Sequence, residues 1–283
     1  MYLGICIYHI YAFFYIKEEI MGLFIYIIIF IIGLLIGSFA TLAIYRIPIG
    51  ENITHKRSFC PNCNHKLGFL DLIPVFSYVF LKGKCRYCSQ KIGKRYIFIE
   101  ICSGIIFLSF ALSLNIDFYA INIAKFIYLI FGFLYFIALL LIAGMDKEKR
   151  FISKKVILYG VIVNFAYILY LYIVGKSNMY RYAIYLFFMS FFLLMNTLLL
   201  QKKGRENYTI DILILCMLII TFSGTVAFEL TVILTLFFIL LRAIKYAIKK
   251  DKENGNILPI GYYLCISNII ILILQNFVIL GGD

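Results

Sequence analysis

The chain contains about eight apolar runs that are each long enough to cross a lipid bilayer. A transmembrane helix needs about 20 predominantly apolar residues. Hydrophobic residues make up 64% of the chain and charged residues 14%, well outside the usual range of soluble proteins. The sequence therefore predicts an all-α polytopic membrane protein whose spans lie at residues 22–45, 98–115, 121–145, 156–174, 181–200, 209–223, 226–248 and 257–280, the run at 209–223 being the weakest.

A basic hydrophilic segment after the first span divides the chain. Residues 46–97 are predicted to form a small loop domain, inserted between the first transmembrane helix at 22–45 and a membrane domain at 98–283. Residues 1–21 are a shorter apolar stretch, and Met21 offers a second start. We expect this stretch to be an over-extended or dispensable N-terminus. A signal peptide is the alternative, although no Ala-x-Ala-like cleavage site follows.

The positive charges fall on alternate connections between the spans. The net charge is +13, and most lysines and arginines gather at residues 46–95, 147–155, 202–205 and 242–252. Cytoplasmic loops of membrane proteins carry an excess of Lys and Arg. These four segments are therefore predicted to be cytoplasmic, and the first span starts outside. This distribution explains the net charge without nucleic acid, so we expect no nucleic-acid partner.

Two Cys-x-x-Cys pairs stand in the loop domain, Cys60 with Cys63 and Cys85 with Cys88. Four thiolates from two tight turns can form a tetrahedral shell around zinc, and disulfides are disfavoured in a reducing cytoplasm. With sulfur at all four positions no place is left for water, so the zinc is predicted to be structural. Any hydrolytic chemistry must then come from other residues.

The best candidates for that chemistry are two aspartates at predicted cytoplasmic ends of spans. Asp146 ends the third span and Asp211 begins the sixth. Two carboxylates about 3 Å apart share one proton, and such a pair can act as acid and base at once. The pair predicts aspartyl protease chemistry, in which one carboxylate activates water and the other polarises a peptide carbonyl. Asp117 lies on the outer side, away from them.

Each aspartate also has a simpler interpretation. Asp146 precedes Lys147, Lys149 and Arg150 and could be a solvated charge at the membrane interface. Asp211 could complement the dipole at the start of its helix. The structure can distinguish the two interpretations. Only a catalytic pair requires the two aspartates to face each other at the same depth in the membrane.

The loop and its flanks resemble the opening of bacterial prepilin peptidases. Residues 37–104 carry the resemblance strongly, beginning with Gly-Ser-Phe at 37–39 and Cys-Pro-Asn-Cys at 60–63. It continues through 71–78, 83–88, Arg95, Tyr96 and Glu100.

The resemblance implies an eight-span membrane aspartyl peptidase of the bacterial plasma membrane. Members of that family remove the leader of type IV pilin-like precursors after a glycine at the cytoplasmic face, and many then methylate the new N-terminus. The family pattern gives Asp146 the role of first catalytic aspartate, with Asp211 the best candidate for the second. Methylation uses S-adenosylmethionine, which is expected here if that activity is retained.

Two positions depart from the family pattern. Ser153 stands where the family has proline, and residues 208–210 replace the run before the aspartate of a Gly-x-Gly-Asp signature. Two alternatives therefore stay open: a family member without proteolysis, and a non-enzymatic assembly factor that docks through its zinc loop. The oligomeric state is left open as well.

Overall fold

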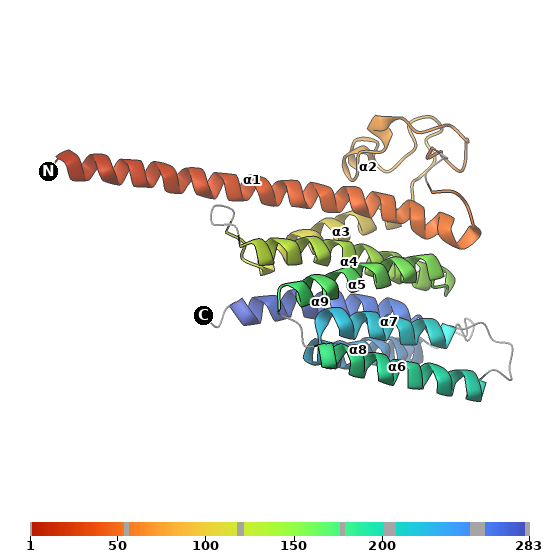
Figure 1. Ribbon diagram of the computed structural model, residues 1–283. Coiled ribbons are helices and arrows are strands. Elements are labelled where there is room, and N and C mark those ends of the chain that lie inside the picture. The colour runs from red at the N-terminus through yellow and green to blue at the C-terminus, as the bar shows by residue number, and fades with distance from the viewer. Residues whose placement is uncertain are drawn as a thin grey trace. The chain divides into compact units, whose positions relative to one another are not determined.

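The computed structural model describes residues 2–53, 57–117, 122–175, 179–200, 208–249 and 258–280, and this part of the chain is mostly helical (Figure 1). Three elements are short: η1 (Ile47–Ile49), η2 (Phe69–Asp71) and α2 (Phe76–Phe80). Extended pairing within the described ranges is limited to two isolated bridges, Phe59 with Lys66 and Lys84 with Lys91. The all-α prediction is confirmed. The long helices are α1 (Tyr2–Arg46), α3 (Lys94–Ser113), α4 (Ile123–Lys149), α5 (Lys154–Ile173), α6 (Met179–Leu200), α7 (Tyr208–Ser223), α8 (Thr225–Lys249) and α9 (Ile260–Leu280).

These eight long helices coincide with the eight predicted spans. Within the described residues, six of them are long and apolar enough to cross a bilayer, namely α1, α3, α4, α5, α8 and α9. The chain is therefore a multi-pass membrane protein. Helix α7 is apolar but shorter, in line with the weak run at 209–223, and many side chains of α6 lie outside the described part. The side chains of residues 1–20 also lie outside it, so the predicted extension at 1–21 stays a prediction.

The chain divides into two compact units, which are described separately. The first consists of residues 1–39, 57–129 and 283, and the second of residues 40–56 and 130–282. The predicted domain boundaries at residues 21, 45 and 97 were drawn at the ends of membrane spans, whereas the two units are defined by contacts between residues. The predicted boundaries therefore stay predictions.

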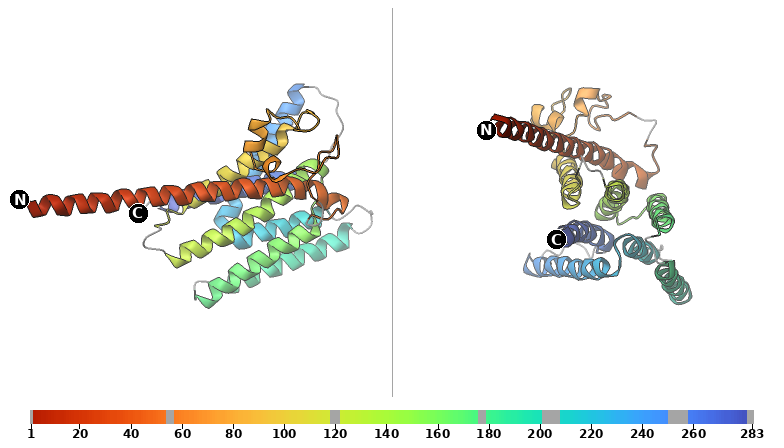
Figure 2. Two further views of the ribbon diagram at one scale, coloured as in Figure 1. Left: turned by 90° about the horizontal axis from the view of Figure 1, so that it is seen from above. Right: turned by 60° about the vertical axis from the view of Figure 1, so that its left-hand side comes forward.

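The first unit is held together by close packing of α1 on α3, two helices that lie side by side in Figure 2. A Cβ atom on Gly33 would lie 2.8 Å from the Cα of Gly104, and one on Gly37 would lie 2.8 Å from the Cα of Glu100. Small residues four apart let the backbones of two membrane helices approach each other. The glycines of α1 thus allow α1 and α3 to pack with their backbones close together.

The second unit has a polar network in its apolar interior. The Tyr135 hydroxyl of α4 donates a 2.7 Å hydrogen bond to Oδ1 of Asn268 on α9. The Asn268 amide in turn donates to Thr231 of α8 at 3.2 Å and to Ser223 of α7 at 3.4 Å. Tyr135 also stacks on Phe222, with ring centroids 4.1 Å apart. These contacts join α4, α7, α8 and α9, so the cytoplasmic ends predicted for α4 and α7 belong to one packed body.

Candidate functional site

The two Cys-x-x-Cys pairs form turns with the same backbone hydrogen bonds. In the first, the Cys60 amide donates to His65 O at 3.0 Å and Asn64 N donates to Cys60 O at 2.8 Å. In the second, the Cys85 amide donates to Gln90 O at 2.8 Å and Ser89 N donates to Cys85 O at 2.9 Å. Asn64 and Ser89 both have positive φ, 56° and 57°. The repeated turn directs backbone amides toward the sulfurs. It gives the two Cys-x-x-Cys pairs the same backbone geometry.

The four predicted metal ligands come together. The Sγ atoms of Cys60, Cys63, Cys85 and Cys88 all lie within 4.8 Å of one another, and those of Cys60 and Cys88 are 3.8 Å apart. Zinc–sulfur bonds of about 2.3 Å in a tetrahedron require sulfurs about 3.8 Å apart. The backbone amide of Gln90 and the side-chain amide of Asn62 lower the pKa of the Cys88 thiol to about 6. The group therefore fits a tetrahedral thiophilic ion, and zinc is the ion that the donor set favours.

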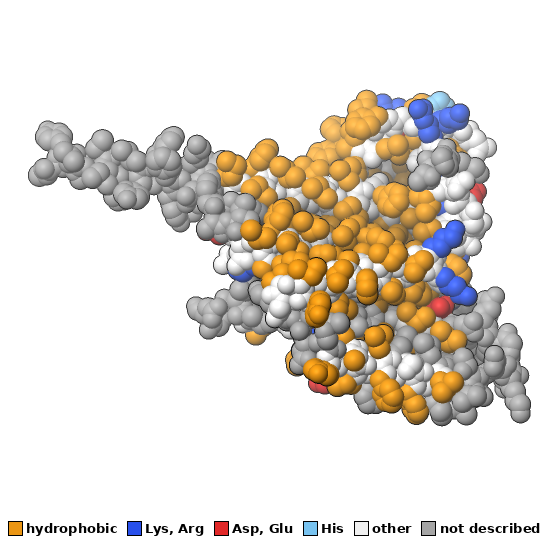
Figure 3. Space-filling model, in the orientation of Figure 1, with side chains coloured by type: hydrophobic (Ala, Val, Ile, Leu, Met, Phe, Trp, Pro, Cys, Tyr) orange, Lys and Arg blue, Asp and Glu red, His pale blue; other side chains and the backbone are white. Residues whose placement is uncertain are grey.

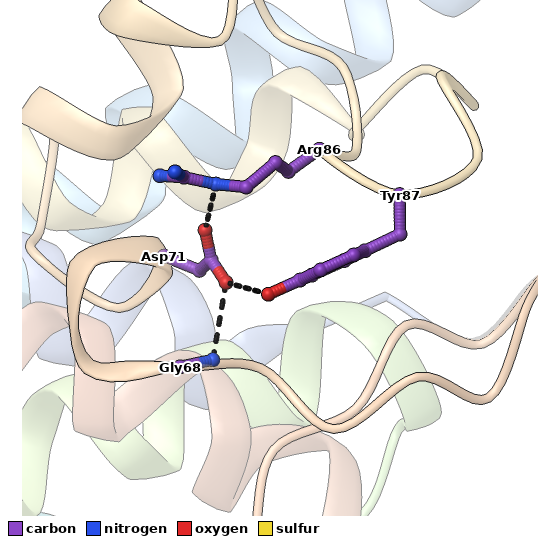
Figure 4. Close-up of polar contacts among 4 residues, drawn as sticks. All are labelled: Gly68, Asp71, Arg86 and Tyr87. Carbon is purple, nitrogen blue, oxygen red and sulfur yellow. Dashed lines mark hydrogen bonds and ion pairs between the residues drawn. The ribbon is translucent and has the colours of Figure 1, made fainter.

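The second turn is fixed by Asp71, as Figure 4 shows. Its carboxylate accepts hydrogen bonds from Arg86 at 2.7 Å, from the Tyr87 hydroxyl at 3.1 Å and from the Gly68 amide at 3.0 Å. The Tyr87 ring also packs on His65 of the first turn, with centroids 3.6 Å apart. Asp71 and Tyr87 thus connect the two turns around the sulfur cluster.

The loop is attached to α3 through Glu100. This buried side chain accepts a 2.8 Å hydrogen bond from the Val75 amide through Oε2. Val75 has φ 62° and ψ −50°, and Phe76 N donates to Pro74 O at 2.6 Å across it. A β-branched residue at positive φ is a true backbone outlier and persists where its surroundings determine it. Glu100 is therefore a structural anchor of the loop.

Asp146 is fully buried near the end of α4 and is held on both oxygens. Oδ1 accepts a 2.9 Å hydrogen bond from the Tyr208 hydroxyl of α7, and Oδ2 accepts a 2.8 Å bond from the Tyr262 amide of α9. A Cβ on Gly261 would lie 3.0 Å from Oδ2, so this glycine permits the close approach. A solvated interfacial charge would be exposed, and the simpler interpretation of Asp146 is wrong for this reason.

Asp211 lies three residues beyond Tyr208 on α7, and both line a pocket of about 680 Å³. The pocket is formed within the second unit by η1 and the residues after it, by residues 150–155 and by the start of α7. Its charged lining consists of three basic residues, Arg150, Lys154 and Lys155, and two acidic ones, Glu51 and Asp211. Asp211 is therefore accessible from the pocket.

Tyr208 bonds to Asp146 and lines the same pocket as Asp211. In the described part of the chain, Asp211 is not among the hydrogen-bond partners of Asp146. Tyr208 instead occupies one oxygen of Asp146 and shares the pocket with Asp211. The catalytic pair stays a prediction.

Four features of this site do not follow from the sequence reasoning. The roles of Asp71, Glu100 and Gly261 depend on contacts between distant segments. Tyr208 had a sequence signal: if Asp211 is the aspartate of the Gly-x-Gly-Asp signature, as predicted, Tyr208 replaces its first glycine.

Comparisons with known proteins agree with the resemblance in the loop region. Residues 31–114 match the family described as Bacterial Peptidase A24 N-terminal domain. Proteins named prepilin leader peptidase/N-methyltransferase are similar to the chain. The one from Vibrio cholerae is 38% identical over 92 residues, covering 29% of this chain and 36% of its own. The one from Bacillus subtilis is 32% identical over 132 residues, covering 47% and 50%.

These matches cover part of each protein. The one from Myxococcus xanthus is 36% identical over 83 residues, which is 29% of this chain and 25% of the relative. The chain thus spans between a quarter and a half of the length of these curated relatives. No solved structure matches the chain. The predicted resemblance of residues 37–104 to bacterial prepilin peptidases is confirmed, because residues 31–114, which hold the four cysteines, Asp71 and Glu100, match the peptidase A24 N-terminal domain family.

Proposed function

We propose that the chain is a membrane aspartic endopeptidase that removes the leader of type IV pilin-like precursors. The names of the relatives and the peptidase A24 N-terminal domain support the class of reaction. The observation that carries the proposal is the arrangement around Tyr208, with buried Asp146 on one side and Asp211 in an open pocket. A buried carboxylate in a membrane protein is costly and is retained mainly for a partner or a task.

In the proposed reaction, Asp146 and Asp211 share one proton across the scissile peptide bond. The ionised carboxylate takes a proton from water, whose oxygen bonds to the carbonyl carbon, while the protonated carboxyl polarises the carbonyl oxygen. The carbon–nitrogen bond then breaks, and the amine leaves with a proton. Tyr208 holds the Asp146 carboxylate in place through Oδ1, and an ionised carboxylate oxygen keeps a second lone pair for water or substrate.

The pocket suits the junction between a leader and a hydrophobic helix. Arg150, Lys154 and Lys155 line it, and all belong to a segment that the positive-inside rule assigns to the cytoplasm. Cleavage after a glycine at the cytoplasmic face of the bacterial plasma membrane follows from this orientation and from the resemblance. Zinc in the four-cysteine group would hold the two turns of the loop and would take no part in hydrolysis.

N-methylation of the new N-terminus, with S-adenosylmethionine as donor, is a second proposed step. The names of the relatives favour it. We assign no residue to it.

The test is leader cleavage of a cognate pilin-like precursor in membranes that contain the full chain. Asp146→Asn and Asp211→Asn should each abolish cleavage, while Asp117→Asn, a change in the α3–α4 connection, should leave it intact. Cleavage by Asp211→Asn at the parent rate would refute the pair. An inactive parent would favour the alternatives, a family member without proteolysis or an assembly factor that docks through the zinc loop. The mass of the product's N-terminal peptide reports methylation.

A further inference from the structure

The loop carries an apolar surface patch outside the membrane-spanning helices. Phe69 of η2 is 83% exposed and Phe80 of α2 is 81% exposed. In α2, positions 76, 79 and 80 share one helix face because they are three and four residues apart. We call this surface the η2/α2 patch, and its members are Phe69, Leu70, Phe76, Val79 and Phe80. A contiguous group of large exposed apolar side chains marks an interaction site.

The hydrogen bond to Glu100 fixes the position along the axis of α3 at which the patch lies. This residue stands six positions after Lys94, where α3 begins, which is a rise of about 9 Å along the helix axis. Helix α3 has 20 residues and is a candidate span, so its length of about 30 Å matches the hydrocarbon thickness. The Val75 amide, directly before α2, bonds to Glu100. Helix α2 therefore starts beside the second turn of a membrane-spanning helix rather than beyond its end.

The charge around the patch fits a negatively charged surface. Between residues 57 and 97 the sequence has eight lysines and arginines and one acid, Asp71, which Arg86 already pairs. Figure 3 shows hydrophobic side chains at the surface of the loop, with Lys and Arg side chains beside them. Aromatic and aliphatic residues next to basic residues are typical of segments that lie in the interface of an anionic bilayer.

We propose that the η2/α2 patch lies in the headgroup and upper acyl region of the bilayer, on anionic lipids, and holds the metal loop against the membrane. The loop is connected at its two ends to α1 and α3, which are both candidate spans, so it must lie close to the bilayer surface. This inference does not depend on proteolysis, and its test needs no precursor.

The chain contains no tryptophan, which permits a direct measurement. Phe80→Trp, and separately Phe76→Trp, places one fluorophore in the patch of the full chain reconstituted in nanodiscs. Lipids brominated near the headgroup end of the acyl chain should quench this fluorescence more strongly than lipids brominated near the chain end. The reason is that interfacial segments lie about 5–10 Å into the headgroup and acyl boundary. Gln90→Trp is the matched control, since Gln90 is exposed on the second cysteine turn and is not a member of the patch.

Phe165→Trp is the reference for a lipid-exposed tryptophan deep in the bilayer, because Phe165 is 67% exposed in the middle of span α5, and shallow bromines should quench it less than the patch tryptophans. Strong quenching of both patch tryptophans and weak quenching of Gln90→Trp would support the proposal. Equal, weak quenching of Phe80→Trp and Gln90→Trp would overturn it. A patch fluorescence that changes only on addition of a precursor would also overturn it, in favour of a protein partner.

The preference for anionic lipid has its own readout. In mixed bilayers of equal composition, the bromine is placed either on phosphatidylglycerol or on phosphatidylcholine. Brominated phosphatidylglycerol should quench Phe80→Trp more strongly, and added salt should reduce the difference because it screens the lysines and arginines. Equal quenching by the two lipids would refute the anionic part of the proposal.

Discussion

The hydroxyl of Tyr208 donates a 2.9 Å hydrogen bond to Oδ1 of Asp146, across 62 positions of sequence. The acceptor is a fully buried aspartate on α4, and the donor is the first residue of α7. Tyr208 also lines the pocket that contains Asp211. One residue thus both holds Asp146 and borders the pocket that contains Asp211.

Replacement of Tyr208 should reduce leader cleavage. Tyr208→Phe keeps the ring and removes one donor to a buried carboxylate, and bonds to charged groups contribute about 1.5–3 kcal/mol. We expect kcat/KM to fall about tenfold, with most of the effect in kcat. Tyr208→Gly should also lower it, even though it restores the first glycine of the signature.

The matched control for this prediction is Tyr262→Phe. Tyr262 holds Asp146 through its backbone amide, so this substitution leaves that bond in place. Parent-like kcat in Tyr208→Phe, at normal membrane levels, would show that the hydrogen bond does not position Asp146 for catalysis.

A larger residue at Gly33 should separate α1 from α3. The added Cβ alone would lie 2.8 Å from the backbone of Gly104, and overpacking of this kind costs about 1–3 kcal/mol. We expect Gly33→Leu to lower the Tm of the full chain in detergent. Gly22→Leu on the same helix is the control, because a Cβ there meets nothing within 4 Å. An equal Tm for the two variants would contradict the close packing.

Loss of the Asp71 carboxylate should weaken metal binding. Arg86 and Tyr87, which it holds, lie between two of the sulfur ligands. Removal of groups that orient metal ligands typically lowers affinity about 10–100-fold. We expect this loss for Asp71→Asn and a smaller one for Tyr87→Phe, measured by competition for zinc with a chelator. Parent-like affinity in Asp71→Asn would count against the role of this contact.

The contribution of Asp71 has a defined pH range. Burial raises the pKa of this carboxyl, but hydrogen bonds from Gly68, Tyr87 and Arg86, together with the charge of Arg86, outweigh burial and bring it below the usual value. A lowered pKa gives stability that is complete above the unfolded value of about 3.9 and is lost as the pH falls through the folded value. The difference in zinc affinity between parent and Asp71→Asn should therefore stay constant between about pH 5 and 7. A difference that disappears within this range would contradict the assignment.

The Tyr135 and Asn268 side chains should show energetic coupling. Each is fully buried, and they bond to each other at 2.7 Å. Hydrogen bonds between membrane helices average about 0.6 kcal/mol in double-mutant cycles and reach about 1.7. A cycle of Tyr135→Phe and Asn268→Leu, followed by denaturant unfolding in detergent, should give a coupling in this range. Tyr135→Phe combined with Asn164→Leu should be closer to additive, since the Asn164 amide donates to Leu218 and Thr221 rather than to Asn268.

The sequence was sufficient for the features that depend on local pattern. Apolar runs of bilayer length specify helices, because each span must satisfy its own backbone hydrogen bonds in lipid. The cysteine spacing specified a four-sulfur group, since two short turns can place their thiolates around one ion. The resemblance across residues 37–104 was visible for the same reason, as its motifs are continuous in the chain, and the family match over 31–114 agrees with it.

Tertiary structure decided the features that join distant segments. The burial of Asp146 depends on α7 and α9, whose contacts no local pattern shows. Glu100 was placed by sequence in α3, but its bond to Val75 and the level at which α2 lies come from the fold of the loop. Periodicity and spacing predict the local structure of a single segment. The hydrogen-bond partner of a buried carboxylate depends instead on which helix packs beside it. Sequence therefore named Asp146, and the packing of α4 with α7 gave it Tyr208 as a partner.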